Sequence, residues 1–136
     1  MKFLVDSNVL SEPTQPAPDT RVVEWLRAHE RELAVSPIIL GEVEYGILLL
    51  PASRRRTRLA QWFTAGVQRI RVLDFDTAAA GQWARLLARL KKGGHAMPIK
   101  DSLIAATALA HGLTVATRNA NDFRNAGVTV ENPFAE

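Results

Sequence analysis

The sequence predicts an α/β protein, a three-layer α/β/α sandwich with a central, mainly parallel sheet. Short apolar runs rich in β-branched residues alternate along the chain with longer segments whose apolar residues recur at helical spacing. The segment 97–112 is an Ala- and Leu-rich helix that one glycine joins to the apolar run 113–117. Because strands connected through helices are parallel and buried on both faces, this alternation indicates a sheet between two helical layers.

Length and composition restrict the class of protein further. With 136 residues, the chain is expected to form one domain, 1–136, with a core of its own. A hydrophobic content of 47% with 23% charged residues fits neither a disordered nor a membrane protein. The chain has no cysteine, which excludes disulfides and zinc–thiolate sites and suits the cytoplasm. Neither a signal peptide nor a membrane span is expected, because the longest apolar run, 38–50, is short and carries two glutamates.

The first half of the chain is expected to contain two strands and two helices. Residues 2–5 form an apolar strand that ends at Asp6, and a loop with three prolines follows. Residues 20–30 are an amphipathic helix, 33–36 a second strand and 37–50 a second helix. Side chains that can cap a first turn precede the helices predicted along the chain: Asp19 or Thr20, Ser36, Ser53 and Asp76.

The second half continues the alternation. Its predicted elements are a helix after Ser53, a strand at 70–73, a helix at 77–91, the helix 97–112, a strand at 113–117 and a short strand at 128–130. In the helix 97–112, Asp101 lies in the first turn, where the helix dipole favours an anion. Pro98 suits the approach to this helix and Gly112 its end.

Four carboxylates are expected at the carboxyl edge of the sheet. Asp6 ends the first strand, Asp101 begins a helix, Asp122 follows the fourth strand, and Glu42 borders the apolar stripe of its helix. Singly, each acid is an ordinary turn, helix-start or surface residue. Together, they would repel one another and raise their pKa values unless a cation neutralised them. Because the ligands would all be oxygens, the pattern favours Mg²⁺ or Mn²⁺.

The net charge of +3 and the arginine cluster at 54–58 give mild support for a polyanionic partner. A solvated helix face explains this cluster equally well. No histidine is spaced to form a nucleophilic triad with a serine, so hydrolysis through a covalent intermediate is not expected.

Four segments resemble the successive motifs of PIN-domain proteins, and most closely those of the VapC and FitB-like toxins of toxin–antitoxin pairs. They are FLVDSNVL (3–10), GEVEYG (41–46), IKDSLIA (99–105) and ATRN (116–119) followed by Asp122-Phe123. The resemblance covers nearly the whole chain. It implies a PIN-like fold and a Mg²⁺-dependent endoribonuclease that forms a homodimer. It also implies a cognate antitoxin whose tail enters the acidic groove, with DNA contacted only through that antitoxin.

Transferred by motif, this resemblance makes Asp6 and Asp101 direct metal ligands, while Glu42 and Asp122 complete the acidic site and help to orient a water. The chain departs from many PIN domains at Asn119, where they have an acid, and Asp122 is the nearest acid to that position. The polar supports near the site would be Asn8, Thr117 and Asn119. The candidate RNA contacts are Arg54, Arg55 and Arg118.

Two other functions stay open at this point. The chain could be a weakly active or inactive PIN module that acts as a binding component of an antitoxin–DNA complex. It could also be a phosphoacceptor receiver domain, which has a strand-end acid and Mg²⁺. A receiver needs its acceptor aspartate after the third strand, where Asp74 and Asp76 stand. It also needs a lysine after the last strands, where this chain has Asn132-Pro133.

Overall fold

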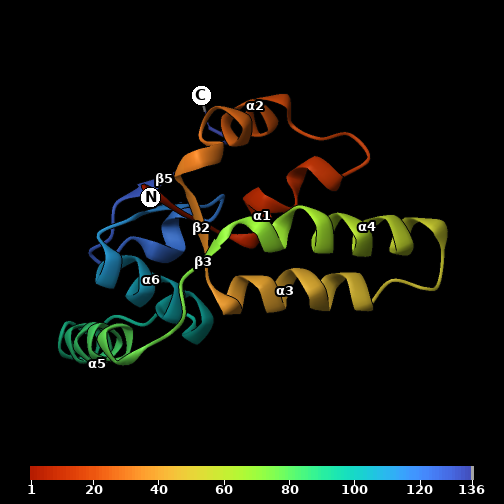
Figure 1. The fold of residues 1–136 in the computed structure, drawn as a ribbon. Coiled ribbons are helices and arrows are strands. Elements are labelled where there is room, and N and C mark those ends of the chain that lie inside the picture. The colour runs from red at the N-terminus through yellow and green to blue at the C-terminus, as the bar shows by residue number, and fades with distance from the viewer. Residues whose placement is uncertain (136) are drawn as a thin grey trace.

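A five-stranded parallel sheet forms the centre of the computed structural model, which describes residues 1–135 apart from the side chain of Gln68 (Figure 1). The strand order is β3-β2-β1-β4-β5, and every neighbouring pair is parallel. The strands are β1 (Phe3–Val5), β2 (Leu33–Val35), β3 (Arg71–Val72), β4 (Thr114–Ala116) and β5 (Val130–Glu131). The predicted α/β class with a parallel sheet is therefore confirmed.

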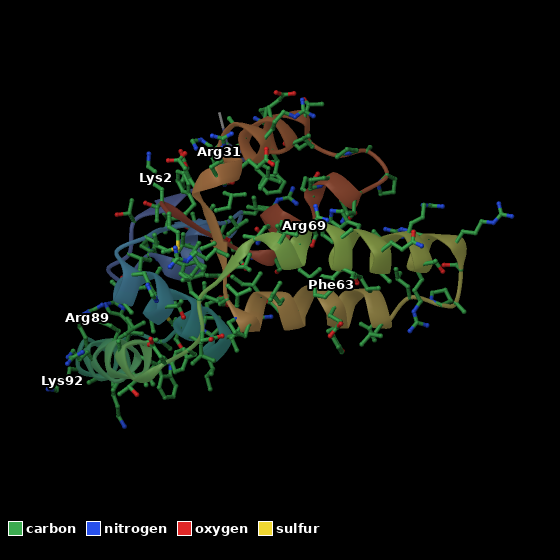
Figure 2. The ribbon with its side chains drawn as sticks, viewed as in Figure 1. Lys2, Arg31, Phe63, Arg69, Arg89 and Lys92 are labelled. Carbon is green, nitrogen blue, oxygen red and sulfur yellow. The ribbon has the colours of Figure 1, made fainter. Side chains whose placement is uncertain are left out.

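Helices cover the sheet and extend beyond it. They are α1 (Ser7–Leu10), α2 (Thr20–Ala28), α3 (Pro37–Leu48), α4 (Arg54–Ala65), α5 (Thr77–Lys92) and α6 (Ile99–His111), with short 3₁₀ helices η1 (Glu12–Thr14), η2 (Glu30–Glu32), η3 (Val67–Arg69) and η4 (Ala120–Phe123). Figure 1 shows α2 on one side of the sheet, α5 and α6 on the other, and α3 and α4 side by side beyond its edge. Phe63 of α4 is buried where α4 faces α3 (Figure 2). Among residues 1–135, none of the helices combines the length and the apolar character that a membrane span requires.

The predicted helix caps are all confirmed. A capping side chain accepts a hydrogen bond from a backbone N–H of the first turn, which has no partner inside the helix. These side chains, with the residue that donates to each, are Asp19 (Arg21), Ser36 (Ile39), Ser53 (Arg56) and Asp76 (Ala79). At the other end of α6, Gly112 adopts the left-handed conformation with φ 66°. Local chemistry therefore determines where these helices begin and where α6 ends.

Most predicted bounds agree to within two residues, and two segments differ in kind or position. The residues after Asp6 do not lead straight into a loop, because Asp6 Oδ1 accepts the N–H of Ser7 at 2.8 Å and caps the short helix α1. Val9 and Leu10 of this helix are buried. The last strand is Val130–Glu131 rather than 128–130, because its pairing with β4 aligns Val130 with Val115.

The strand order excludes the receiver-domain alternative. A receiver sheet has the order 2-1-3-4-5, in which the third strand is central. Here β3 is an edge strand that pairs only with β2 in the described sheet. Asp74 follows this edge strand and is exposed, while Asp76 caps α5. Neither aspartate reaches the centre of the carboxyl edge.

The core lies against the central strands and fixes the helix that carries Asp101. The largest fully buried side chains include Leu4, Ile39, Leu86, Ile104 and Phe123. Helix α6 packs along α5, and Trp83 Nε1 of α5 donates to Ser102 Oγ of α6 at 2.9 Å. Because Ser102 directly follows Asp101, this contact fixes the first turn of α6 beside the sheet.

Gly112→Ala is expected to lower the free energy of unfolding by about 1 to 2 kcal/mol, because an L-residue is strained at this positive φ. A Cβ at this position would meet no heavy atom within 4 Å, so the cost is purely conformational. Gly41→Ala is the matched control. Gly41 lies inside α3 with equal free space, and alanine is expected to stabilise the helix there by about 0.5 to 1 kcal/mol. Urea unfolding of both variants measures the difference, and a loss of stability in both would contradict this explanation.

Candidate active site

Asp6 is fixed at the end of the central strand β1. Its side chain is buried, with 5% exposed. Oδ1 accepts the N–H of Ser7 at 2.8 Å and Oδ2 accepts the hydroxyl of Thr117 at 2.7 Å. Burial raises the pKa of the Asp6 carboxyl, the bonds from Thr117 and Ser7 oppose this rise, and the nearby Glu42 carboxylate adds to it. This carboxylate is therefore held in place but is costly to ionise.

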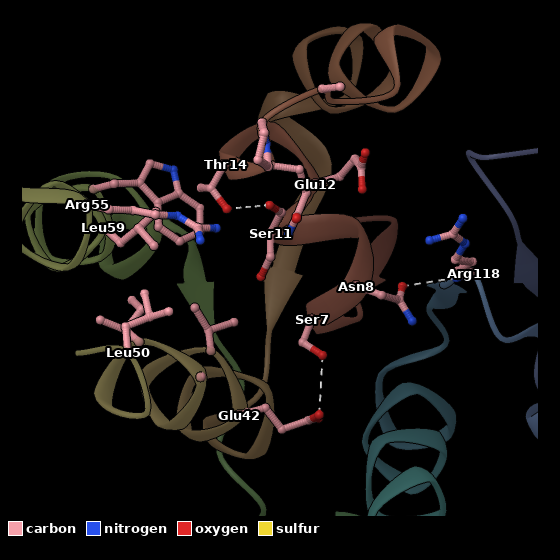
Figure 3. A pocket seen from close by; sticks show the side chains of 17 residues that line it. Ser7, Asn8, Ser11, Glu12, Thr14, Glu42, Leu50, Arg55, Leu59 and Arg118 are labelled. Carbon is pink, nitrogen blue, oxygen red and sulfur yellow. Dashed lines mark hydrogen bonds between the residues drawn. The ribbon is translucent and has the colours of Figure 1, made fainter. Parts of the chain in front are cut away.

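Thr117 connects the first predicted motif to the last. Its buried Oγ1 donates to Asp6 and accepts the N–H of Asn119 at 3.1 Å and the Nδ2–H of Asn8 at 3.4 Å. Asn8 Oδ1 in turn accepts the N–H of Arg118 at 3.0 Å (Figure 3). All three predicted supports thus lie around Asp6, although Asn119 takes part through its backbone rather than its side chain.

Glu42 reaches the same edge from the second turn of α3. Its Oε2 accepts the hydroxyl of Ser7 at 3.3 Å (Figure 3) and lies 2.9 Å from Nζ of Lys100. Its Oε1 is buried and has no hydrogen-bond partner in the part of the chain that the structure describes. An orphaned carboxylate oxygen is unfavourable by itself. Glu42 therefore has one oxygen fixed by the protein and one buried oxygen without a partner among the described residues.

Asp101 is the most perturbed carboxylate. Partial burial raises its pKa to about 6, and the negative charges of Asp6, Asp122 and, more weakly, Glu42 add to this rise, while Lys100 opposes it. Its side chain forms no hydrogen bond or ion pair with any other described residue. The structure therefore brings the four predicted acids together, and Asp6, Glu42 and Asp122 each raise the pKa of Asp101.

Asp122 stands at the rim of this group. It lies in η4, where its backbone N–H bonds to the carbonyl of Asn119 at 3.0 Å and the next residue, Phe123, anchors the turn in the core. Its side chain is exposed and contributes to the raised pKa of Asp101. The side chain of Asn119, at the position where many PIN domains have an acid, is also exposed. Asp122 is therefore the fourth acid that acts on Asp101.

A groove of about 780 Å³ opens beside the acids, between α3, α4 and the segment after β1 (Figure 3). Its polar part includes Ser7, Asn8 and Glu42, and its apolar part includes Leu50, Leu59 and Trp62. Of the three predicted RNA-contacting arginines, Arg55 and Arg118 line this groove. Arg54 does not line it and is exposed near the start of α4.

Lys100 and Ser7 were missed by the sequence reasoning. Lys100 is the cation nearest to Glu42, and the hydrogen bond to Glu42 raises the pKa of its ammonium group. Both residues stand directly beside a predicted metal ligand in the chain. That adjacency was the available signal, but only the fold brings either residue to Glu42.

The donor set fits a hard divalent cation. All candidate ligands are carboxylate oxygens, two of the acids have raised pKa values, and Oε1 of Glu42 is without a partner. Among residues 1–135, no three His, Asp or Glu side chains are grouped closely enough to hold an ion by themselves. Two direct carboxylate ligands with water completing the shell are consistent with both observations, and Mg²⁺ is commonly held in this way.

Fold and site together define a class: α/β proteins with acidic side chains gathered at the carboxyl edge of a parallel sheet. The PIN domain family matches residues 3–128. The chain belongs to the PIN domain family, in the branch of the VapC and FitB toxins.

Two relatives and one solved structure support this placement. The VapC ribonuclease Y4jK of Sinorhizobium fredii is 38% identical, over 97% of both chains. The toxin FitB of Neisseria gonorrhoeae is 36% identical, over 97% of this chain and 98% of its own. The solved structure of FitAB bound to an IR36 DNA fragment superposes with a TM-score of 0.92 at 34% identity, over 98% of this chain and 96% of that chain.

Proposed function

We propose that this protein is a Mg²⁺-dependent endoribonuclease and the toxin of a toxin–antitoxin pair, acting on RNA in the cytoplasm, with Mn²⁺ as an alternative ion. The observation that carries the proposal is the convergence of four acids from separate parts of the chain. Partial burial together with the charges of the other three acids raises the pKa of Asp101 to about 6. Such a group is unfavourable without a cation and suited to binding one. The relative named a VapC ribonuclease supports the same activity.

In this proposal, the residues divide the work by how the fold holds them. Asp6 and Asp101 would hold the ion, with Thr117 keeping the Asp6 carboxylate in place. When bound, a divalent ion stabilises negative charge on a phosphoryl oxygen and lowers the pKa of a water. Glu42, fixed through Oε2, would help to orient the attacking water, and Asp122 would complete the negative rim.

Arginines beside the acids would bind the phosphates that flank the cleavage site. Arg55 and Arg118 line the groove next to Ser7 and Glu42, which suits contacts with the phosphodiester backbone. Arg54, one residue before Arg55 but outside the groove, would contact a more distant phosphate. These contacts would position the RNA without selecting its sequence.

The proposed protein partners are a cognate antitoxin and a second copy of this chain. The apolar part of the groove, at Leu50, Leu59 and Trp62, leads to the acidic part and would accept the antitoxin tail. DNA would be contacted only through the antitoxin. At the end of α3, Tyr45, Leu48 and the C-cap residue Leu49 are 64%, 60% and 67% exposed, and such an apolar strip suits a homodimer contact.

Lys100→Met is expected to lower the melting temperature in EDTA and to increase the rise that Mg²⁺ produces, because Glu42 then loses its neutralising cation. Thermal denaturation across a Mg²⁺ titration measures both effects. Lys2→Met is the control, since Lys2 is also exposed but lies at the opposite end of β1. An unchanged or smaller Mg²⁺ effect in Lys100→Met would show that this ammonium does not compete with the ion.

The function is tested by incubating the purified protein, free of antitoxin, with structured RNA and Mg²⁺. EDTA-sensitive cleavage that Asp6→Asn and Asp101→Asn abolish is the expected result. Equal cleavage by wild type and both variants would mean that a contaminant cuts the RNA. No cleavage by any of them, with formation of a DNA-bound antitoxin complex, would favour the inactive binding module instead.

A further inference from the structure

We propose that a small pocket beside Asp122 binds one unstacked nucleobase of the RNA substrate. The pocket is separate from the large groove, and the inference rests on the proposed nuclease function. It has a volume of about 390 Å³ and is lined by Arg118, Asn119, Ala120, Asn121, Asp122 and Asn132. Three of these six residues are asparagines, which the metal site and the groove do not explain.

The pocket adjoins the acidic site on one side and the groove on the other. Asp122 and Asn119 line the pocket, and the backbone N–H of Asn119 donates to Thr117 Oγ1, the hydroxyl that holds the Asp6 carboxylate. Arg118 lines both the pocket and the groove that contains Arg55 and Glu42. An RNA strand held along the groove, with its phosphate at the acids, would therefore bring a neighbouring nucleotide to this pocket.

The asparagines offer what the edge of a base requires. Each side-chain amide carries donors and an acceptor in one plane, which can match the polar edge of a base. Asn132 Oδ1 accepts the N–H of Phe134 at 2.9 Å, so this bond orients its amide and leaves its NH₂ group as a donor. The side chains of Asn119 and Asn121 are exposed and have no hydrogen bond to other described residues. Their hydrogen-bonding capacity is thus available to a ligand.

Arg118 supplies a planar surface against which a base can stack. Its Cζ lies 4.5 Å from the centroid of the Phe134 ring, and its backbone N–H is held by Asn8. A guanidinium that rests on an aromatic ring on one side can stack with a base on the other. Unpaired RNA bases are commonly recognised by such stacking together with amide contacts to their edges.

The chemistry of the pocket distinguishes a base from other ligands. The lining contains one acid, Asp122, and one cation, Arg118, so it has no net charge that would attract a phosphate or an acidic side chain. The polar amides disfavour an apolar side chain, which would leave them without hydrogen bonds. A neutral, flat and hydrogen-bonding group satisfies both conditions, and in an RNA substrate that group is the nucleobase.

The test compares base preference around the cut. A pool of single-stranded RNA with random sequence is cleaved in Mg²⁺ by wild type, Asn121→Ala, Asn132→Ala and Phe134→Leu, and the bases on both sides of each cut are counted. Asn125→Ala is the matched control, because Asn125 is exposed in the same region but does not line the pocket. Wild type and control are expected to share a base preference at one position beside the cut. The pocket variants are expected to weaken this preference about fivefold or more. Circular dichroism melting confirms that each variant folds.

A second measurement does not depend on cleavage. Asp101→Asn protein is titrated against fluorescein-labelled octamers of rA, rC and rU, and then against the preferred octamer with one abasic position. In the double variant with Asn121→Ala, the octamers should bind with equal affinity. The abasic position should weaken binding to Asp101→Asn but not to the double variant. If wild type cleaves RNA but the pocket variants keep its base preference, the nucleobase pocket is wrong and the nuclease function stands. If wild type cleaves no RNA and Asp101→Asn binds none, the proposed function itself fails, and the pocket with it.

Discussion

Asp101→Asn is expected to slow RNA cleavage by a factor of about 10² to 10³ while the protein stays folded. The substitution removes one of the two proposed direct ligands, and charge stabilisation through a bound ion contributes several kcal/mol to such reactions. Asp101 has no hydrogen bond to other described side chains, so its replacement breaks no structural contact. Single-turnover cleavage of a labelled RNA at saturating protein measures the rate of the chemical step.

Asp101 is a better test than Asp6, which has two roles. Asp6 caps α1 and accepts the hydroxyl of Thr117, so Asp6→Asn disturbs the structure as well as the site. Asp74→Asn is the matched control, because Asp74 is an exposed acid beside the edge strand β3. This control should cleave at the wild-type rate. Wild-type cleavage by Asp101→Asn would rule out Asp101 as a ligand.

Without a divalent ion, ionisation of Asp101 should lower the free energy of unfolding as the pH rises from about 4 to about 6. The pKa of Asp101 is about 6 in the folded protein and 3.8 ordinarily, so in this interval the folded state retains a proton that the unfolded state has released. Stability then falls with increasing pH, and above pH 6 the penalty stays constant. The raised pKa of Asp6 acts in the same direction.

Mg²⁺ should reverse this loss where the acids are ionised. At pH 7.5 a bound ion relieves the repulsion and raises the melting temperature, whereas at pH 5 protonated acids bind it weakly and the rise should be small. Thermal melts from pH 4.5 to 8, in EDTA and in Mg²⁺, measure both effects. The Asp101→Asn variant isolates the contribution of the Asp101 carboxyl, because the stability of this variant should depend less on pH. The same pH dependence in wild type and Asp101→Asn would exclude Asp101 as the source, and no Mg²⁺ effect at pH 7.5 would contradict ion binding.

The sequence predicted most of the fold because the relevant signals are local. Ser36, Ser53 and Asp76 cap helices within three residues of their own position, and Gly112 ends α6 through its own φ angle. The alternation of strands and helices sufficed for the parallel sheet, since strands joined in this way must run in one direction. The short helix α1 was missed because its cap, Asp6, reads equally well as the end of a strand.

For the site, the sequence by itself determined which side chains the chain offers and at which ends of which elements they stand. That was enough to predict that Asp6, Glu42, Asp101 and Asp122 share one edge. Only the tertiary structure decided that Lys100 pairs with Glu42, that Arg55 lines the groove while Arg54 does not, and that three asparagines surround a pocket at Arg118. The physical reason is the sequence distance over which each interaction acts. Caps and alternation act over a few residues, whereas ion pairs, desolvation and pockets depend on distances between segments that only the packed fold brings together.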